Sequence, residues 1–405
     1  MSNVLVNVET FNRGGLALLQ NSNPMVKLAN KMFNELNKIP KNLGDTVTFD
    51  LPPFVQGTES LAFGTYQSVT QNQWPLTVDK PYSVTIGMSN EEKIFNLETY
   101  MGSLGKSAIA TISTYIGDKV GLNCIDHTYF TYGDGTQAGI CSYTQLAQAV
   151  ANYRNMGVPM TDEIVAIIPD VAVPAIIGSG VNQFAPARND EAVNSWEIGA
   201  FANVKWYTSN QLPEHIAGTL GQSGNTLTVT SISGDGASIT FSGAPASDAD
   251  ALKVGDILTF QQTTLRFTDY WGMVTTSQPV QVRVTDNNGG SSGGGSITVD
   301  VFPPLIATGR GKNINTAITA GMTAKCKGNH RAGVLFCKRA LFLAMPPLGN
   351  TSPYEGATET DPVTGASLRS FYGFLPTEGA YGYAHQVLFG STLVDRYAMR
   401  LAFPV

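Results

Sequence analysis

Charged residues are scarce in this sequence. Asp, Glu, Lys and Arg together make up 14% of its 405 residues, against about 25% in typical globular proteins. The formal net charge of −6 argues against a protein that binds nucleic acid mainly by neutralising phosphates. A neutral polar surface suits a chain that covers much of its exterior with copies of itself, and it also suits secreted adhesins.

Cysteine and histidine are scarce as well, which bears on redox and metal chemistry. The sequence has four of each, all widely spaced: Cys124, Cys141, Cys326 and Cys337; His127, His215, His330 and His385. Neither a CxxC nor an HExxH spacing occurs, so no zinc site is predicted. The thiols are predicted to be reduced, as in a protein made in a cytoplasm, and the histidines to be structural.

The motifs of common catalytic sites are missing too. No GxSxG occurs, so no nucleophile elbow is predicted. The glycine-rich stretch 289–295 lacks the Lys-Ser/Thr of a phosphate-binding loop, and Asp248 with Asp250 forms too short a pattern for an EF-hand. The sequence therefore predicts no enzyme, no cofactor and no metal, although an enzyme with an unrecognised site stays an alternative.

Long apolar runs are also lacking. No window approaches the roughly 20 apolar residues needed to span a bilayer. The opening residues, MSNVLVNVETFNRGG, show no basic region followed by an apolar one, so no signal peptide is predicted. We expect a chain that is assembled inside a cell and has no membrane partner.

The most informative segment that is present is 332–348, AGVLFCKRALFLAMPPL. Two apolar runs, ending at Phe336 and Met345, are separated by the basic pair Lys338 and Arg339. Uninterrupted apolar runs of this length indicate strands that are buried on both faces. The double proline that follows ends the second strand, because proline cannot continue a central ladder.

The N-terminal region, residues 1–45, contains one predicted helix from Asn23 to Leu36. Asn23 suits the cap position and Pro24 suits the first helical position. The rest of this region is polar and lacks a continuous core pattern. It is therefore predicted to be an arm that lies on something else.

Residues 46–90 contain two stretches in which apolar and polar residues alternate, which predicts strands. Between them lie about 23 residues, more than the roughly 12–15 residues that most connections use. A two-stranded ribbon that projects from the body explains this length. A disordered surface loop is the alternative.

The longest helical pattern covers residues 91–126, where apolar residues recur near the 3.6-residue period. At about 1.5 Å per residue, this helix would be roughly 50 Å long. The following region, 127–218, is predicted to be a mixed α/β layer. Its elements are a helix over 143–156, a strand over 163–168 and a helix over 171–177.

Residues 219–307 change to short strands. TLTVTSISGDGASITFS predicts a hairpin around its Gly-Asp-Gly turn, and LKVGDILTF, PVQVRVTD and SITVDVFPPLI add further strands. NNGGSSGGGS is a flexible loop by composition. Several short strands at close spacing predict a small all-β unit, most simply a barrel. Because mixed α/β patterns resume over 308–405, this unit is predicted to be an insertion in a host domain.

The order of residues in segment 332–348 resembles the late core strands of tailed-phage major capsid proteins of the Hong Kong 97 fold. The succession of elements looks like that fold as well: a projecting ribbon, one long helix, an α/β layer and late core strands. The inserted β unit is similar to the β-barrel domain in the coat proteins of short-tailed Salmonella phages, where LKVGDILTF looks like a strand pair.

This resemblance implies an α+β capsid fold of the Hong Kong 97 type with an inserted barrel-like domain. Its parts would be an N-terminal arm (1–45), an E-loop ribbon with its strands (46–90), a spine helix (91–126), a peripheral and axial α/β region that includes the A-domain (127–218), the inserted domain (219–307) and a return to the core with C-terminal strands (308–405). It also implies that the E-loop contacts neighbouring subunits, through Phe54, Glu59, Leu61, Phe63, Tyr66 and Trp74.

The function implied by the resemblance is that of a major capsid protein, which self-assembles into the icosahedral head of a tailed bacteriophage around double-stranded DNA. Its partners would be copies of itself in pentamers and hexamers, a separate scaffolding protein and a portal, with a decoration protein left open. The packaged DNA would be held without sequence-specific binding. An encapsulin-like compartment and an extracellular β-rich adhesin are the alternatives.

Overall fold

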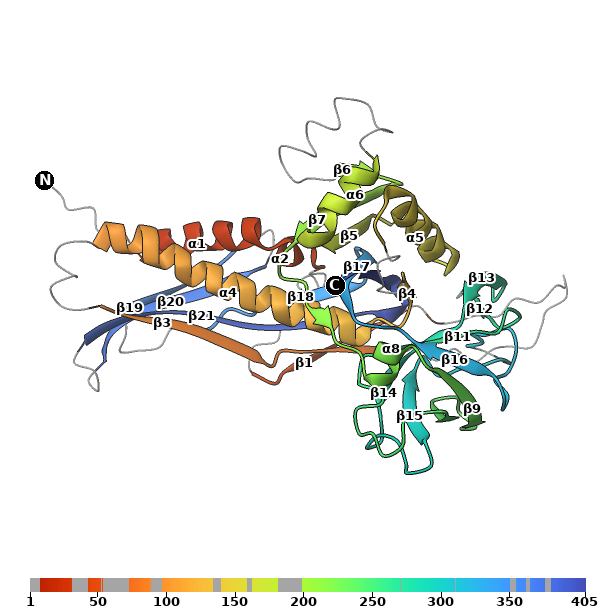
Figure 1. Cartoon of the computed structure of the whole chain (residues 1–405). Coiled ribbons are helices and arrows are strands. Elements are labelled where there is room, and N and C mark those ends of the chain that lie inside the picture. Colours follow the sequence, from red (N-terminus) through yellow and green to blue (C-terminus); the bar gives the residue numbers. More distant parts are fainter. Residues whose placement is uncertain are drawn as a thin grey trace, which may run out of the picture. The chain divides into compact units, whose positions relative to one another are not determined.

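The chain has a mixed α+β architecture made of two compact units (Figure 1). The computed structural model describes residues 8–30, 43–51, 53, 73–88, 97–133, 140–158, 162–180, 199–269, 271–309, 311–349, 355–361, 365–375 and 380–405. The first unit combines Met1–Phe49, Gln73–Asn123 and Leu341–Thr392. The second combines Asp50–Asn72, Cys124–Ala340 and Leu393–Val405. Each unit is therefore assembled from segments that lie far apart in the sequence.

A long antiparallel sheet forms the body of the first unit. Its strands follow the order β18 (Leu341–Ala344), β21 (Ala380–Leu393), β20 (Ser367–Leu375) and β19 (Glu355–Thr360), and β3 (Lys80–Met88) also pairs with β21. The half-buried Tyr82 of β3 stacks on Tyr115 of α4 (Leu97–His127), with ring centroids 3.9 Å apart. The alternation of exposed and half-buried residues along β3 thus turns one face of this strand toward the helix.

The predicted long helix is present over all of its described residues. Helix α4 has 31 residues, which gives a length of about 46 Å at 1.5 Å per residue. The predicted residues 91–96 lie outside the described part of the chain. Ile109, Ile112, Ile116 and Val120 are buried, as their near-3.6 spacing requires.

The N-terminal prediction is partly wrong. Asn23 does cap a helix, since its Oδ1 accepts the Met25 N–H at 2.9 Å, but α2 runs only over Pro24–Leu28. Ala29 is extended, with ψ of 142°, so this helix ends at Leu28. The rest of the predicted helix beyond residue 30 lies outside the described residues. An unpredicted helix, α1 (Val8–Ser22), precedes it and packs on β19 and β20. Helix α1 thus lies on the sheet of its own unit.

A seven-stranded sheet organises the second unit. Its order is β4 (Thr131–Tyr132), β22 (Ala398–Phe403), β17 (His330–Cys337), β5 (Ile164–Pro169), β7 (Val204–Ser209) and β6 (Gly199–Phe201), and β8 (Glu214–His215) pairs with β17. The predicted elements of this layer are present as α5 (Tyr143–Asn155), β5, the short helix η2 (Asp170–Ala172) and α6 (Val173–Gly180). Every residue of β5 and β22 is buried.

Segment 332–348 does contain two strands, but they serve different sheets. Strand β17 lies inside the seven-stranded sheet of the second unit, and β18 joins the long sheet of the first. The chain passes from one unit to the other at Ala340 and Leu341. The basic pair Lys338 and Arg339 therefore lies in the turn just before the chain passes from the second unit to the first.

The inserted β unit is a closed six-stranded barrel. Its strands follow the order β10 (Ser238–Ser242), β15 (Ser296–Phe302), β14 (Gln281–Asp286), β11 (Ile257–Phe260), β16 (Thr323–Cys326) and β9 (Thr226–Ile232), which pairs again with β10. Alternate residues of β10 and β15 are buried, as barrel strands require. A short helix, α8 (Thr219–Ser223), precedes the barrel.

The predicted range of the insertion, 219–307, omits one barrel strand. Strand β16 pairs with both β11 and β9 and closes the barrel, yet it begins sixteen residues after position 307. Its sequence, TAKC, is too short and too mixed to be recognised from its pattern. The glycine-rich loop was predicted to be flexible, but it is hydrogen-bonded at Ser291 and Ser292 to Asp248, Ser247 and Ser296.

Candidate functional site

Two strands hold the ends of the segment that was predicted to be a ribbon. Strands β1 (Thr46–Asp50) and β2 (Gln73–Thr77) pair as a two-stranded sheet, and the hydroxyls of Thr46 and Thr77 lie 2.9 Å apart. Of the predicted contact residues, Trp74 lies in β2. The others lie outside the described residues and stay predictions: Phe54, Glu59, Leu61, Phe63 and Tyr66.

Aromatic and aliphatic side chains fix this strand pair, which we call the loop base. Phe49 of β1 stacks on Phe342 with ring centroids 4.5 Å apart. The half-buried Trp74 donates its indole N–H to the Thr392 hydroxyl at 2.9 Å. A buried apolar cluster combines Leu76 of β2 with Val78, Ala344 and Leu388, and Phe49 packs against it. Trp74 is thus an anchor within its own unit, and its contact with another subunit stays a prediction.

A glycine allows the loop base to approach strand β21 closely. A Cβ atom on Gly390 would lie 2.1 Å from the carbonyl oxygen of Thr77, which is far inside van der Waals contact. Only glycine fits there without displacing β2. The position of the loop base therefore depends on backbone contact as well as on side-chain packing.

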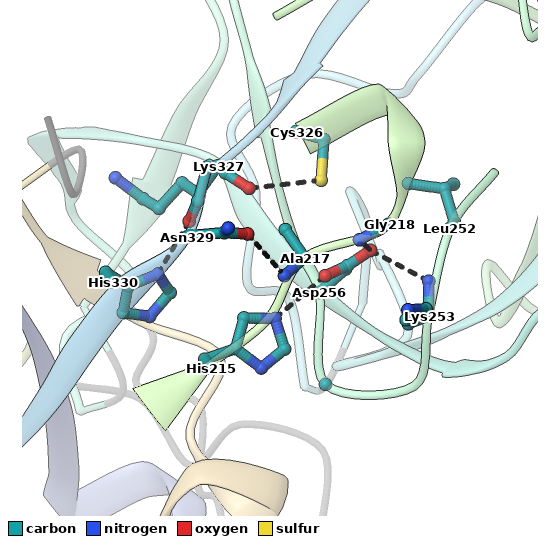
Figure 2. A network of polar contacts seen from close by, with 12 residues as sticks. His215, Ala217, Gly218, Leu252, Lys253, Asp256, Cys326, Lys327, Asn329 and His330 are labelled. Atoms are coloured by element: carbon teal, nitrogen blue, oxygen red, sulfur yellow. Dashed lines mark hydrogen bonds and ion pairs between the residues drawn. The ribbon is translucent and has the colours of Figure 1, made fainter. Parts of the chain in front are cut away.

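A second group of contacts, which we call the barrel junction, joins the barrel to the seven-stranded sheet within the second unit (Figure 2). The chain enters the insertion after β8 and returns in β17, and these two strands pair at His215 and His330. The imidazole rings of the two histidines lie 5.2 Å apart. The ends of the insertion are therefore held side by side.

Asp256 is the central acceptor of the barrel junction (Figure 2). Its carboxylate is fully buried and accepts the backbone N–H groups of Lys253 at 2.8 Å and Gly218 at 3.1 Å. Its other oxygen lies 2.8 Å from Nε2 of His215. A buried carboxylate needs such donors, because an unpaired one would be strongly destabilising. Asp256 therefore connects the turn before β11 to His215 in β8 and to Gly218 just after this strand.

Arg400 of β22 adds the end of helix α4 to the barrel junction. Its guanidinium is fully buried and donates to the carbonyl oxygens of Ile125, Thr128 and Gly255 and to the Thr128 hydroxyl. The last carbonyls of a helix have no partner within the helix, so a cation suits this position. Burial, and then the nearby Arg283, lower the pKa of Arg400 to about 9.

Barrel side chains also cover the edge of the seven-stranded sheet at β4. Gln281 accepts the Thr131 N–H at 2.7 Å and donates to its carbonyl at 3.1 Å, as a neighbouring strand would. Lys327 donates to the carbonyl of Gly133. An uncovered edge would offer these groups to another chain. A cavity of about 410 Å³ lies beside this edge, and its described lining includes neither a carboxylate nor an imidazole.

One pair of side chains in the first unit looks catalytic but is enclosed. Ser370 Oγ lies 2.7 Å from Nδ1 of His385, and both residues are at most 2% exposed. Burial lowers the pKa of His385 to about 4, so the ring is neutral at pH 7. A substrate cannot reach this pair in the folded chain, and the contact links β20 to β21 instead.

Metal and thiol chemistry gain no support from the described part of the chain. No group of three or more His, Cys, Asp or Glu residues there is placed to hold a metal ion. None of the four cysteines, all of which lie in the described residues, forms a disulfide bond. Burial, helped by Asp126, raises the pKa of Cys124 to about 12, which keeps its thiol protonated and unreactive. Within the same described residues, no helix is long and apolar enough to cross a membrane.

The residues of the barrel junction were not predicted from the sequence. One signal was available for Arg400, which stands between Met399 and Leu401 in an otherwise apolar strand. A lone arginine inside a buried strand must find acceptors. The contacts of Asp256 with His215 and Gly218, and of Gln281 with Thr131, join distant segments, and no local spacing indicates them.

Comparisons with known proteins give similarities in structure alone. No protein-family model and no curated protein matches the sequence. Similar solved structures include Mycobacterium phage Che8 (9% identity, TM-score 0.45, covering 93% of this chain and 89% of that one) and the capsid of Ralstonia phage GP4 (8%, 0.44, 91% and 86%). A virus-like particle from Pyrococcus furiosus is also similar (5%, 0.41, 97% and 98%). At these low values, the function proposed below rests on the residues of the chain itself.

Proposed function

We propose that this chain is a shell subunit, the major capsid protein of a tailed bacteriophage. In this proposal, copies of the chain form pentamers and hexamers that close into an icosahedral head around double-stranded DNA. The chain would act through its contacts with other copies and would catalyse no reaction. A separate scaffolding protein and a portal would assist assembly in the cytoplasm of the host.

The observation that carries the proposal is the inserted barrel. A closed barrel interrupts the α/β sheet between two strands, β8 and β17, that pair with each other. This is the arrangement implied by the sequence resemblance to capsid proteins with a β-barrel insertion. Such an insertion leaves the host sheet intact, because its two ends leave and re-enter at one place.

The loop base supports the proposal from a second part of the chain. It fixes both ends of residues 51–72 with Phe49, Trp74 and the backbone contact at Gly390. A long connection on a firm base suits an element that reaches another molecule. In the proposal, residues 52–72 are the E-loop, α4 is the spine helix and the seven-stranded sheet belongs to the A-domain.

Electron microscopy of the purified full-length chain tests this proposal. Negatively stained samples are expected to contain closed shells, or capsomers that close when a scaffolding protein is added. Nuclease treatment followed by DNA extraction would separate a DNA-filled head from a compartment that encloses protein. Only monomers, at every protein and salt concentration and with scaffold present, would contradict the proposal.

A further inference from the structure

One end of the seven-stranded sheet carries an excess of positive charge. Strands β5, β7 and β22 begin at this end, and β17 ends there. The first residue of β5, Ile164, pairs with the last residue of β17, Cys337, and with the first residue of β7, Val204. The first residue of β22, Ala398, pairs with Phe336 of β17. The charged side chains at this end that are not buried include Lys205, Lys338, Arg339, Arg396, Asp162 and Glu163, and we call this group the basic sheet end. The carboxyl group of Asp395, next to Arg396, is buried. Four cations therefore meet two acids in a chain whose net charge is −6.

The two acids are already shared among the cations. Glu163 lies 2.5 Å from the Lys205 ammonium and 3.9 Å from that of Lys338. Asp162 lies 3.2 Å from the guanidinium of Arg339. These three cations still have side chains that are 58–67% exposed. The positive excess thus faces outward, where it can meet a negatively charged partner.

The barrel carries the opposite charge on two neighbouring loops, which we call the acidic barrel loops. Asp248 and Asp250 lie on the first loop and Asp286 begins the second. The loops are tied together by Asn287, which donates to the carbonyl of Ala249 at 3.1 Å. Asp250 and Asp286 are exposed. Among the described residues, no ion pair within the chain joins these loops to the basic sheet end.

We infer that the basic sheet end binds the acidic barrel loops of a second copy of this chain, an inference that rests on the proposed function. Opposite charges on two different surfaces favour a head-to-tail contact between copies, and such contacts generate rings when the rotation closes. The mixed signs within the basic sheet end suit a protein partner better than a uniform row of phosphates, because Asp162 and Glu163 would repel DNA.

Charge reversal with rescue tests this contact in the full-length chain. The basic variant is Lys338→Glu with Arg339→Glu, and the acidic variant is Asp250→Lys with Asp286→Lys. The third protein carries all four changes. A matched control reverses two barrel lysines outside both surfaces, Lys312→Glu with Lys325→Glu. Circular dichroism and the melting temperature show whether each variant folds, and sedimentation velocity measures association.

Each two-site variant is expected to raise the concentration needed for association about tenfold or more, and the four-site variant to recover most of this loss. Mixing the two singly reversed proteins should also restore association between them. High salt should weaken association of the wild type and of the four-site variant, whose surfaces attract each other. It should not weaken association of either two-site variant, in which like charges face each other. The lysine control is expected to associate like the wild type.

Association of both reversed variants at the wild-type concentration would overturn the inference. Loss of association without any rescue in the four-site variant or in the mixture would overturn it too. So would normal shells from the basic variant that retain less DNA, because the basic sheet end would then contact nucleic acid. If the basic variant fails to fold, the acidic variant provides the test. Its association, alone and mixed with wild-type chains, is then measured by sedimentation velocity, and association like that of the wild type in the variant alone would overturn the inference.

The outcomes separate this inference from the proposed function. Normal shells from every variant would refute the contact and leave the capsid proposal in place. The wild type could instead form only small oligomers that never close into shells. If their association is lost in the two-site variants and restored in the four-site variant, the capsid proposal would be refuted and the contact supported.

Discussion

The guanidinium of Arg400 illustrates how one residue can hold several elements together. It lies in a strand that is buried throughout and donates to backbone oxygens from the end of α4 and from the turn before β11. Hydrogen bonds to charged groups contribute roughly 1.5–3 kcal/mol each. Loss of the side chain would remove its hydrogen bonds to the carbonyl oxygens of Thr128 and Gly255, and a buried acceptor without a donor is the costly case.

Arg400→Met is therefore expected to lower the free energy of unfolding by about 3 kcal/mol or more. Urea unfolding followed by circular dichroism measures this change. Lys205→Met is the matched control, because Lys205 is 58% exposed and its partner Glu163 is 42% exposed. The control should cost about 1 kcal/mol or less. Equal effects of the two substitutions would contradict the role given to Arg400.

Buried histidines predict how stability depends on pH. Burial, with Arg400 as the next cause, lowers the pKa of His330 to about 3, and burial lowers that of His385 to about 4. Between about pH 6.5 and 4 these two histidines therefore bind more protons in the unfolded chain than in the folded chain, and their contribution to stability falls as pH falls. Asp395 acts in the opposite direction, because burial raises its pKa to about 8.

His385→Asn isolates one of these contributions. The variant lacks the titrating ring, so its stability is expected to fall less than that of the wild type between pH 6.5 and 4, by up to about 3 kcal/mol. The difference between the two proteins removes the contribution of Asp395, which both contain. Urea unfolding across this pH range measures the free energy of unfolding of both proteins. If the two plots of this free energy against pH were parallel, the pKa of His385 would not be lowered as its burial requires.

At the scale of elements, the loop base depends on a backbone contact between β2 and β21. Gly390→Ala is expected to destabilise the chain by about 1–3 kcal/mol, because the new methyl group would meet the Thr77 carbonyl and force the strands apart. Gly87→Ala is the matched control, since a Cβ on this β3 residue meets nothing within 4 Å. Thermal unfolding of both variants gives the comparison; a control as unstable as Gly390→Ala would argue against the contact.

The barrel gives a prediction about its own boundaries. A fragment covering 217–327 contains all six strands and is expected to unfold cooperatively. A fragment covering 219–307 lacks β16, so β9 and β11 each lose a partner and the barrel has two open edges. Amide resonances and thermal melts distinguish a folded fragment from a collapsed one. A cooperative melt of the shorter fragment would show that β16 is dispensable.

Elements with a strong local pattern could be predicted from the sequence. The period of the long helix, the apolar runs of β17 and β18 and the alternation in β10 and β15 all reflect burial that repeats along the chain. Strand β16 and helix α1 were missed because their stability comes from partners that are distant in sequence. The end of α2 was misplaced for the same reason, since Asn30 is hydrogen-bonded to Leu341.

The candidate sites were less predictable than the fold. A pattern could indicate where a long connection begins and ends, and it placed Trp74 at its boundary. It could not indicate that Asp256, Arg400 and Gln281 meet around the insertion. Their contacts with Gly218, Ile125 and Thr131 span 38, 275 and 150 residues, respectively. Contacts of this kind follow from the tertiary structure and leave no spacing in the sequence.

For the whole molecule, the proposal separates folding from assembly. The loop base is anchored within its own unit, so removal of Thr58 to Gln71 is expected to leave a folded chain with a near-normal melting temperature. The same deletion should prevent regular shells, because residues 52–72 are proposed to contact a neighbouring subunit. Circular dichroism and electron microscopy measure the two properties separately, and normal shells from the deletion variant would remove the E-loop assignment.

The most direct test of the shell proposal is a near-atomic reconstruction, by electron cryomicroscopy, of particles formed by the full-length chain. We expect an icosahedral shell in which residues 52–72 of each copy lie against a neighbouring copy. A monomer or a small ring with a deep, polar-lined pocket would contradict the proposal.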